Sequence, residues 1–152
     1  MTSFLGPFIV DSPISLMANR DVTPLAMSKF LISGTGPMTT TGVIAGGYFA
    51  TKYAKAQPGP IWPDIQHSLI GLGVFGAFSK QLSRAINVPT STLDKYFQGA
   101  YGKDGFFIIN LLSRSASRGT IELSSPDPND YPLIYPNYFE KDIDMKVLIE
   151  GK

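Results

Sequence analysis

The chain has 152 residues, of which 43% are hydrophobic and 16% charged, and its formal net charge is +1 at pH 7. This composition suits one modest apolar core, and it excludes the basic surface that nucleic acids or anionic membranes would require. There is no cysteine and only one histidine, His67, so disulfides, thiolate metal sites and histidine metal clusters are excluded. No apolar run approaches the length of a membrane span, and we expect no membrane insertion.

Charged side chains are unevenly placed along the chain. Residues 1–100 carry eleven of them and residues 101–152 carry fourteen. A surface with so few charges is typical of one that packs against something else. A loop-rich segment whose polar groups come from serine and threonine is the alternative, and the sequence leaves both open.

The first half of the chain reads as a helix followed by loops and strands. Residues 21–33 have helical spacing, with Asp21 or Thr23 as N-cap and Pro24 in the first turn, and the helix should end before Gly34. Glycine, threonine and proline break every regular pattern after it. We expect a loop over 34–42, a strand over 48–53, a turn over 57–60 and a strand over 64–70.

The second half begins with two helices, over 75–87 and from Thr90 or Ser91 to about 101. Residues 105–112 are apolar at both alternating positions, which is typical of a central strand covered on two sides. A turn at 118–119 makes 120–124 the expected hairpin partner of that strand. A turn cluster over 125–130 and an extended, proline-rich stretch come next, and a last helix starts at Asp142 or Asp144 and runs through Leu148.

Several blocks of this sequence, in this order and spacing, resemble the glucose-methanol-choline (GMC) oxidoreductases. Within that family they are most similar to the insect enzymes called glucose dehydrogenases, which use FAD and a quinone. The blocks are Gly34-Thr-Gly-Pro-Met-Thr-Thr40, Trp62-Pro-Asp-Ile-Gln66, the stretch 106–112, Ser117-Arg-Gly-Thr-Ile-Glu-Leu123, Pro132-Leu-Ile-Tyr-Pro-Asn-Tyr-Phe139 and residues 142–151.

The resemblance implies an α+β fold, a mainly antiparallel sheet with helices packed on one face. It also implies a flavoenzyme that oxidises an alcohol or sugar by hydride transfer to FAD. Residues 1–152 look like an incomplete substrate-binding domain, without the FAD-binding domain or the catalytic C-terminal segment. The resemblance therefore implies that FAD is held mainly by segments outside this chain.

The catalytic and cofactor-binding residues are therefore expected to lie outside the chain, which alone should be inactive, and no metal site is expected. His67 does not match the family's catalytic histidine motif, and we reject it as the base. The expected partners are the alcohol or sugar and the remainder of the same enzyme chain. The alternative is a non-catalytic module, derived from such an enzyme, that binds a ligand or a protein.

Four residues are predicted to bind substrate. The resemblance places the strand 64–70 against the flavin cavity, and strand alternation puts Gln66, Ser68 and Ile70 on one face with His67 pointing away. Gln66 and Ser68 could instead bond neighbouring backbone. Asn110, the fourth, interrupts an apolar strand, so a substrate group or a protein group should hydrogen-bond it. Arg118 is predicted to be structural, tying a turn to carbonyls or a carboxylate.

Overall fold

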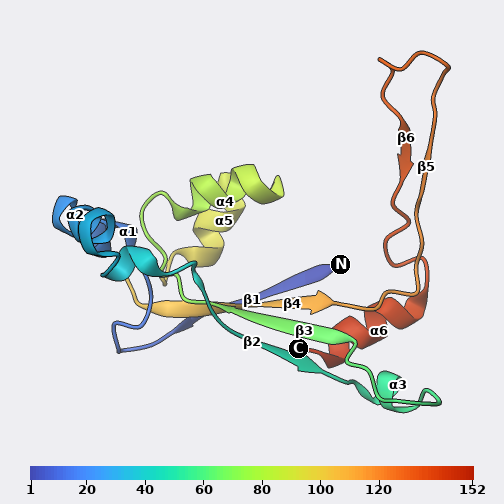
Figure 1. Cartoon of the computed structure of the whole chain (residues 1–152), viewed down its shortest axis with the longest axis horizontal. Coiled ribbons are helices and arrows are strands. Elements are labelled where there is room, and N and C mark those ends of the chain that lie inside the picture. The colour runs from blue at the N-terminus through green and yellow to red at the C-terminus, as the bar shows by residue number, and fades with distance from the viewer. The chain divides into compact units, whose positions relative to one another are not determined.

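The computed structural model describes residues 1–152 and has an α+β fold with a mainly antiparallel sheet (Figure 1), as the sequence predicts. The main sheet has the strand order β1-β4-β3-β2, and β5 pairs with β6 separately. The elements are β1 (Thr2–Ile9), α1 (Ala18–Asp21), α2 (Pro24–Ser33), the 3₁₀ turn η1 (Pro37–Thr39), β2 (Val43–Phe49), α3 (Lys52–Lys55), β3 (Ile65–Ile70), α4 (Phe78–Ile86), α5 (Thr90–Phe97), β4 (Gly105–Leu112), β5 (Thr120–Glu122), β6 (Leu133–Tyr135) and α6 (Asp142–Glu150).

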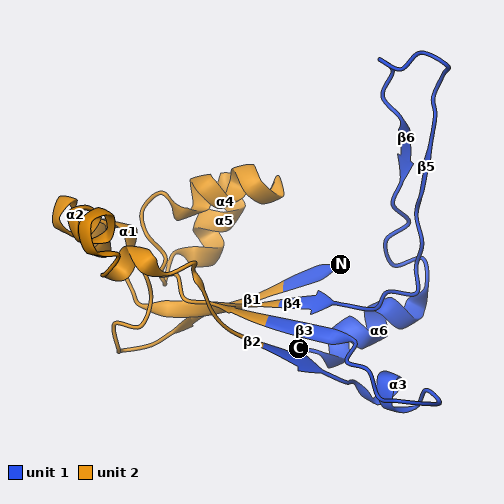
Figure 2. Ribbon diagram, in the orientation of Figure 1, with its two compact units in different colours: residues 1–3, 47–67, 110–152 blue, residues 4–46, 68–109 orange.

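The chain divides into two compact units, coloured separately in Figure 2. Unit 1 contains residues 1–3, 47–67 and 110–152, and unit 2 contains residues 4–46 and 68–109. Each unit has its own apolar core. None of the helices has the length and apolar character needed to cross a bilayer.

The core of unit 2 is an aromatic cluster between α4, α5 and β4. Phe107 of β4 is 1% exposed, and its ring stacks on that of Phe78 with centroids 5.5 Å apart. Phe97 of α5 meets the same two rings edge-on, at 5.3 and 6.0 Å. Offset-stacked and edge-to-face pairs are the favoured aromatic geometries. Burial of these rings holds the two helices of this unit on the strand.

Helix α2 begins and ends where its sequence signals indicate. The Thr23 hydroxyl accepts a hydrogen bond from the Ala26 N–H at 3.1 Å, and Pro24 occupies the first turn. Gly34 ends the helix in the left-handed conformation, with φ 62°, which glycine adopts without strain. Thr23 is therefore the N-cap and Asp21 is not, because the Asp21 carboxylate is bound by the Met17 N–H and the Arg20 guanidinium.

Arg20 links three segments of unit 2. Its guanidinium donates to both carboxylate oxygens of Asp21 at 2.8 Å, to Asp104 at 2.6 Å and to the Ser15 carbonyl at 2.7 Å. These hydrogen bonds hold the pKa of Asp21 and that of Asp104 below the ordinary value of 3.8. A carboxylate with a lowered pKa stabilises the fold above that ordinary value, and the stabilisation is lost as the pH falls through the folded-state pKa.

Replacing Arg20 with glutamine should therefore lower the melting temperature at neutral pH and make it less dependent on pH. The difference in melting temperature between the variant and the parent protein should narrow as the pH falls below about 3.8. Below that pH the carboxyls become protonated and no longer attract the guanidinium. Melting curves between pH 2 and pH 7 measure this. Arg84→Gln, at an exposed arginine in the last turn of α4, is the control and should leave the profile unchanged. A gap that stays constant with pH would contradict the expectation.

The core of unit 1 joins β3, β4 and α6. Ile65, Leu112, Val147 and Leu148 are buried together. Asp142 and Asp144 lie in the first turn of α6, where negative charge is favourable. The predicted last helix is confirmed, and its Val147 and Leu148 form the buried side.

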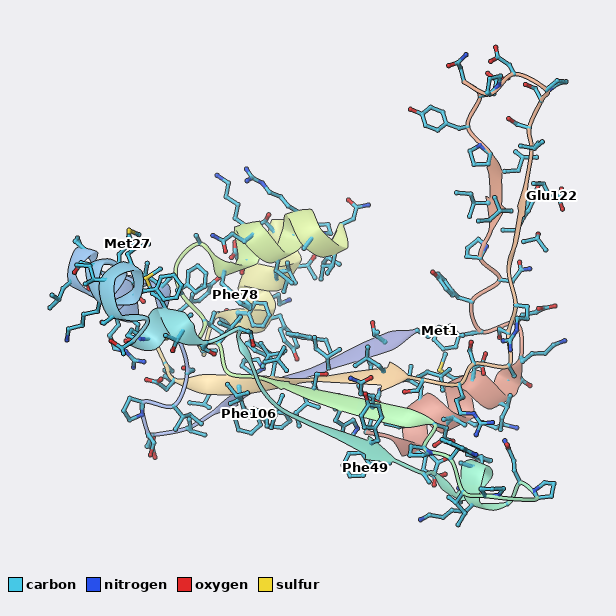
Figure 3. All side chains as sticks on the ribbon, viewed as in Figure 1. Met1, Met27, Phe49, Phe78, Phe106 and Glu122 are labelled. Atoms are coloured by element: carbon cyan, nitrogen blue, oxygen red, sulfur yellow. The ribbon has the colours of Figure 1, made fainter.

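Strands β5 and β6 form a hairpin in unit 1, with Thr120 opposite Tyr135 and Glu122 opposite Leu133. Residues of both strands are exposed, and Figure 3 shows their side chains, that of Glu122 among them, extending away from the ribbon. The predicted pairing of 120–124 with 105–112 is wrong, because β5 pairs with the extended stretch that follows the turn cluster. At the base of the hairpin, a Cβ on Gly119 would lie 2.5 Å from the Tyr135 carbonyl oxygen.

Several predicted boundaries also need correction. The strand expected over 48–53 is β2, Val43–Phe49, which begins earlier because an edge strand tolerates two adjacent glycines. Thr51 then caps the short helix α3 by accepting from the Ala54 N–H. Helix α4 starts three residues later than expected. Helix α5 is preceded by Pro89 instead of a serine or threonine cap, and it ends at Phe97.

Candidate functional site

Strand β3 presents alternate residues to opposite faces of the sheet. Ile65 lies in the core of unit 1 with residues of α6. His67 follows it on the same face, where its Nε2 lies 2.6 Å from the Gly151 carbonyl oxygen and its ring packs against Phe49 at 4.8 Å. Gln66 is half-buried and, by alternation, points to the other face. His67 therefore points away from Gln66, as predicted, and its Nε2 is occupied by a carbonyl.

Asn110 of β4 is fully buried. Its side-chain amide donates a hydrogen bond of 3.1 Å to the Leu148 carbonyl, so a protein group meets the predicted need for a partner. The other amide atom, Oδ1, is buried without a hydrogen-bond partner. Leaving an acceptor of this kind unpaired costs about 1–3 kcal/mol. Oδ1 is also closed to solvent, because Asn110 is 0% exposed.

Two of the four residues predicted to bind substrate, Gln66 and Asn110, belong to unit 1, and the other two, Ser68 and Ile70, belong to unit 2. Asn110 faces α6, as Ile65 and His67 do, whereas Gln66 points to the opposite face of the sheet. Ser68 is half-buried and shares the Gln66 face by alternation. Ile70 packs against the aromatic core of unit 2. The contact of these four residues with substrate stays a prediction. Gln66 and Ser68 are two residues apart in β3, so they lie on the same face of the sheet.

Unit 1 has a groove of about 670 Å³ beside α6. Two buried carboxylates border it, and backbone N–H groups bind both. Asp64 accepts from the Thr51 N–H at 2.9 Å and from the Thr51 hydroxyl at 2.6 Å. No motif in the sequence predicted this groove. The remaining lining residues are Tyr53, Ala56, Gln57, Ser113, Arg114, Ser115, Ala116, Arg118, Ile143 and Val147.

Asp144 is the second carboxylate. It is 1% exposed and accepts from the backbone N–H groups of Ala116 at 2.6 Å and Ser117 at 2.8 Å. Burial alone would raise the pKa of Asp144, but the hydrogen bonds from Ser117 and Ala116 outweigh burial and hold that pKa below 3.8. Asp144 therefore stays ionised and fastens the loop before β5 to α6. An aspartate in the first turn of an expected helix is the sequence signal that could have found it.

Arg118 has the structural role predicted for it. Its Nη1 donates to the carbonyls of Ser115 at 2.6 Å and Ser117 at 2.9 Å. Its own carbonyl accepts from the Asn137 side chain at 3.2 Å, which ties the turn to the segment after β6. The guanidinium thus stabilises the loop that Asp144 holds from the other side.

The glycine-rich segment after α2 does not fit the pyrophosphate of FAD. Gly34 is the C-cap of α2, so the loop lies at the carbonyl end of that helix. Phosphate binds at the opposite end, where free N–H groups and the positive end of the dipole lie. No group of three or more histidine, cysteine, aspartate or glutamate side chains could hold a metal ion. No catalytic base is assigned within this chain.

Comparison with known proteins connects this arrangement to a family. Residues 115–152, which include the hairpin and α6, match the family described as GMC oxidoreductase. An oxygen-dependent choline dehydrogenase from Burkholderia lata is 29% identical over 118 residues, covering 78% of this chain and 17% of that protein. The chain is 30% identical to its counterpart from Burkholderia cenocepacia, with the same coverage of 78% and 17%.

A chloroplastic fatty acid photodecarboxylase from Chlamydomonas reinhardtii is also similar, at 27% identity over 135 residues, or 83% of this chain and 19% of that protein. The chain thus spans 17 to 19% of the length of the relatives it matches. The chain is thus similar to the GMC oxidoreductases over residues 115–152, and to these relatives over 78 to 83% of its length.

Proposed function

We propose that the chain is part of the substrate-binding domain of an FAD-dependent oxidoreductase that acts on CH–OH groups. The observation that carries this proposal is the family match over the hairpin and α6, joined to relatives that align with most of the chain. FAD, bound by segments outside residues 1–152, would supply the hydride acceptor. What this chain contributes is the wall that encloses and orients the donor.

The proposed hydride donor is an alcohol, and this class includes sugars. The resemblance to insect glucose dehydrogenases is not supported by the relatives found, which are named choline dehydrogenases and a fatty acid photodecarboxylase. Gln66 and Ser68 are the proposed polar contacts, and Ile70 the proposed apolar one. Asn110 is the fourth proposed contact.

The test is an absorption spectrum of the whole enzyme that contains these residues. A bound flavin should give the yellow oxidised spectrum, and adding the correct alcohol without an electron acceptor should bleach it. A panel of sugars, choline and aliphatic alcohols identifies the donor class. A colourless protein, or a flavin that no alcohol reduces, would contradict the proposal. The chain of residues 1–152 alone is the control and should remain colourless.

Replacing Ser68 with phenylalanine in that enzyme should change substrate preference by about tenfold or more in kcat/KM between a small and a bulky alcohol. The reason is steric, since filling or emptying a pocket by a few carbon atoms is worth about 1–3 kcal/mol of discrimination. Ser124→Phe, at an exposed serine beyond β5, is the matched control. Equal kcat/KM ratios in both variants and the parent would remove Ser68 from the pocket.

A further inference from the structure

An apolar groove runs beside α4 in unit 2, and we call it the α4 groove. Its volume is about 430 Å³, within the range of about 300–1,000 Å³ that small-molecule pockets occupy. Seven of its eight lining residues are apolar, none is charged, and Gln81 is the single polar one. Such a lining offers few partners to the several hydroxyls of a sugar, which would lose hydrogen bonds to water there. It suits a hydrocarbon chain.

Helix α4 forms one wall of the α4 groove. Phe78, Leu82 and Ala85 line it, and their spacing places them on one side of the helix. The Phe78 ring, labelled in Figure 3, is fixed by its stacking on Phe107 at 5.5 Å. Leu82 is half-buried against the same aromatic core. This wall is therefore part of the packed core of unit 2 and keeps its shape without a ligand.

The opposite wall is a short bridge between two extended segments, at Leu16 and Leu72. The Leu16 N–H donates to the Gly71 carbonyl at 2.9 Å, and the Leu16 carbonyl accepts from the Gly73 N–H at 3.1 Å. These backbone bonds fix the two leucine side chains relative to each other. A groove with two fixed walls can bind a ligand without first paying for ordering of its own side chains.

The α4 groove continues the face of β3 that carries the predicted substrate contacts. Ser68 and Ile70 share that face by alternation, and the chain remains bridged as far as Leu72. Leu72 lines the groove, and Ile70 packs against the core to which Phe78 belongs. A hydroxyl beside Ser68 and a carbon chain in the groove would therefore be parts of one molecule.

We infer that the α4 groove binds the hydrocarbon chain of the hydride donor, so that the donor class is alcohols with an aliphatic tail. This inference rests on the proposed function, which places an alcohol against this chain, and it narrows that alcohol. The tail would run past Leu72 toward Leu82. Binding should strengthen with each methylene group that leaves water, until the groove is filled.

Kinetics with primary alcohols of increasing length test the groove in the whole enzyme. kcat/KM should rise about fourfold for each added methylene group and then level off. Ala85→Trp, which introduces an indole ring at an exposed position of the groove wall, should lower the ratio of kcat/KM for 1-decanol to that for 1-propanol at least about tenfold. Arg84→Trp, at the neighbouring exposed residue of α4 that does not line the groove, is the control and should keep the parent ratio.

A ratio that Ala85→Trp leaves at the parent value, or a series in which kcat/KM does not change with length, would overturn the inference. Ala85→Leu adds less bulk and should lower the same ratio to a smaller extent. The test therefore does not depend on the folding of the tryptophan variant. Melting temperature and flavin content show whether each variant is folded.

A photoaffinity probe locates the tail without relying on turnover. An undecanol with a diazirine at the end of its chain should, on illumination of the whole enzyme, label residues 72–85, and excess 1-decanol should suppress that label. An unlabelled α4 would mean that another part of the enzyme fills the groove, and it would overturn the inference. The flavin spectrum separates the two failures. A labelled groove without a flavin that alcohols reduce overturns only the proposed function, whereas an unlabelled groove beside a flavin that sugars or short alcohols bleach overturns only the tail site.

Discussion

Replacing Phe107 with alanine is expected to lower the free energy of unfolding by about 4 kcal/mol, the largest effect of any single substitution considered. The ring is 1% exposed and lies between Phe78 and Phe97, with Phe4 stacked at 4.7 Å on it as well. Removing it deletes buried apolar surface, opens a cavity and breaks three aromatic contacts at once. Urea unfolding followed by far-UV circular dichroism measures the change.

Two further variants define the origin of that loss. Phe107→Leu keeps much of the volume and should lose less than half as much stability, about 1–2 kcal/mol. Tyr131→Ala, at an aromatic residue that is 92% exposed, should change stability by less than about 0.5 kcal/mol. If Phe107→Ala behaved like Tyr131→Ala, the aromatic cluster could not be the core of unit 2.

The Asp144→Asn substitution is expected to lower the free energy of unfolding by about 2–3 kcal/mol at pH 7. The carboxylate accepts two backbone N–H bonds, and an amide offers one acceptor oxygen and turns an NH₂ toward the second donor. One buried N–H is then left unpaired. Because the groove beside α6 is bordered by the same loop, the variant should also loosen residues 115–118, which hydrogen exchange would report.

The pH dependence of that effect has a definite sign. The folded-state pKa of Asp144 lies below 3.8, so the ionised group stabilises the fold above that value, and its contribution disappears as the pH falls through the folded-state pKa. The stability gap between parent and Asp144→Asn should therefore close in acid. Asp142→Asn, an exposed aspartate in the same helical turn, should lose only about 0.5 kcal/mol. A gap that widened in acid would mean that Asp144 is protonated in the folded protein.

Local signals predicted the elements whose limits are set by neighbouring residues. The helix over 24–33 has a threonine cap, a first-turn proline and a left-handed glycine at its end, and all three are read directly from the chain. The continuous apolar run over 105–112 likewise predicts the central strand β4, confirmed by its place between β1 and β3. Such features need no information from distant residues.

Pairing and pocket geometry depend on distant residues, and there the predictions failed or stopped short. Thr51 starts a helical turn because Asp64, thirteen residues later, binds its N–H and hydroxyl. Strand β5 pairs with β6 and not with β4, although the alternation of apolar and polar residues in β5 is compatible with either partner. The sequence left open whether a substrate group or a protein group would bind Asn110, and the Leu148 carbonyl of α6 is the partner that the fold supplies. Each outcome follows from a long-range contact that spacing in the sequence cannot supply.

The close approach at Gly119 limits how the hairpin can misfold. Sliding β5 by one residue would bring a side-chain carbon of Arg118 or Thr120 against the carbonyls of Tyr135 and Pro136, which lie within 2.9 Å of where the missing carbon would stand. Slippage of that kind is the usual hazard of a ribbon with little burial on either side. Steric exclusion at its base thus fixes the register of the hairpin. Insertions or substitutions in the turn at its tip should be tolerated as long as Gly119 remains.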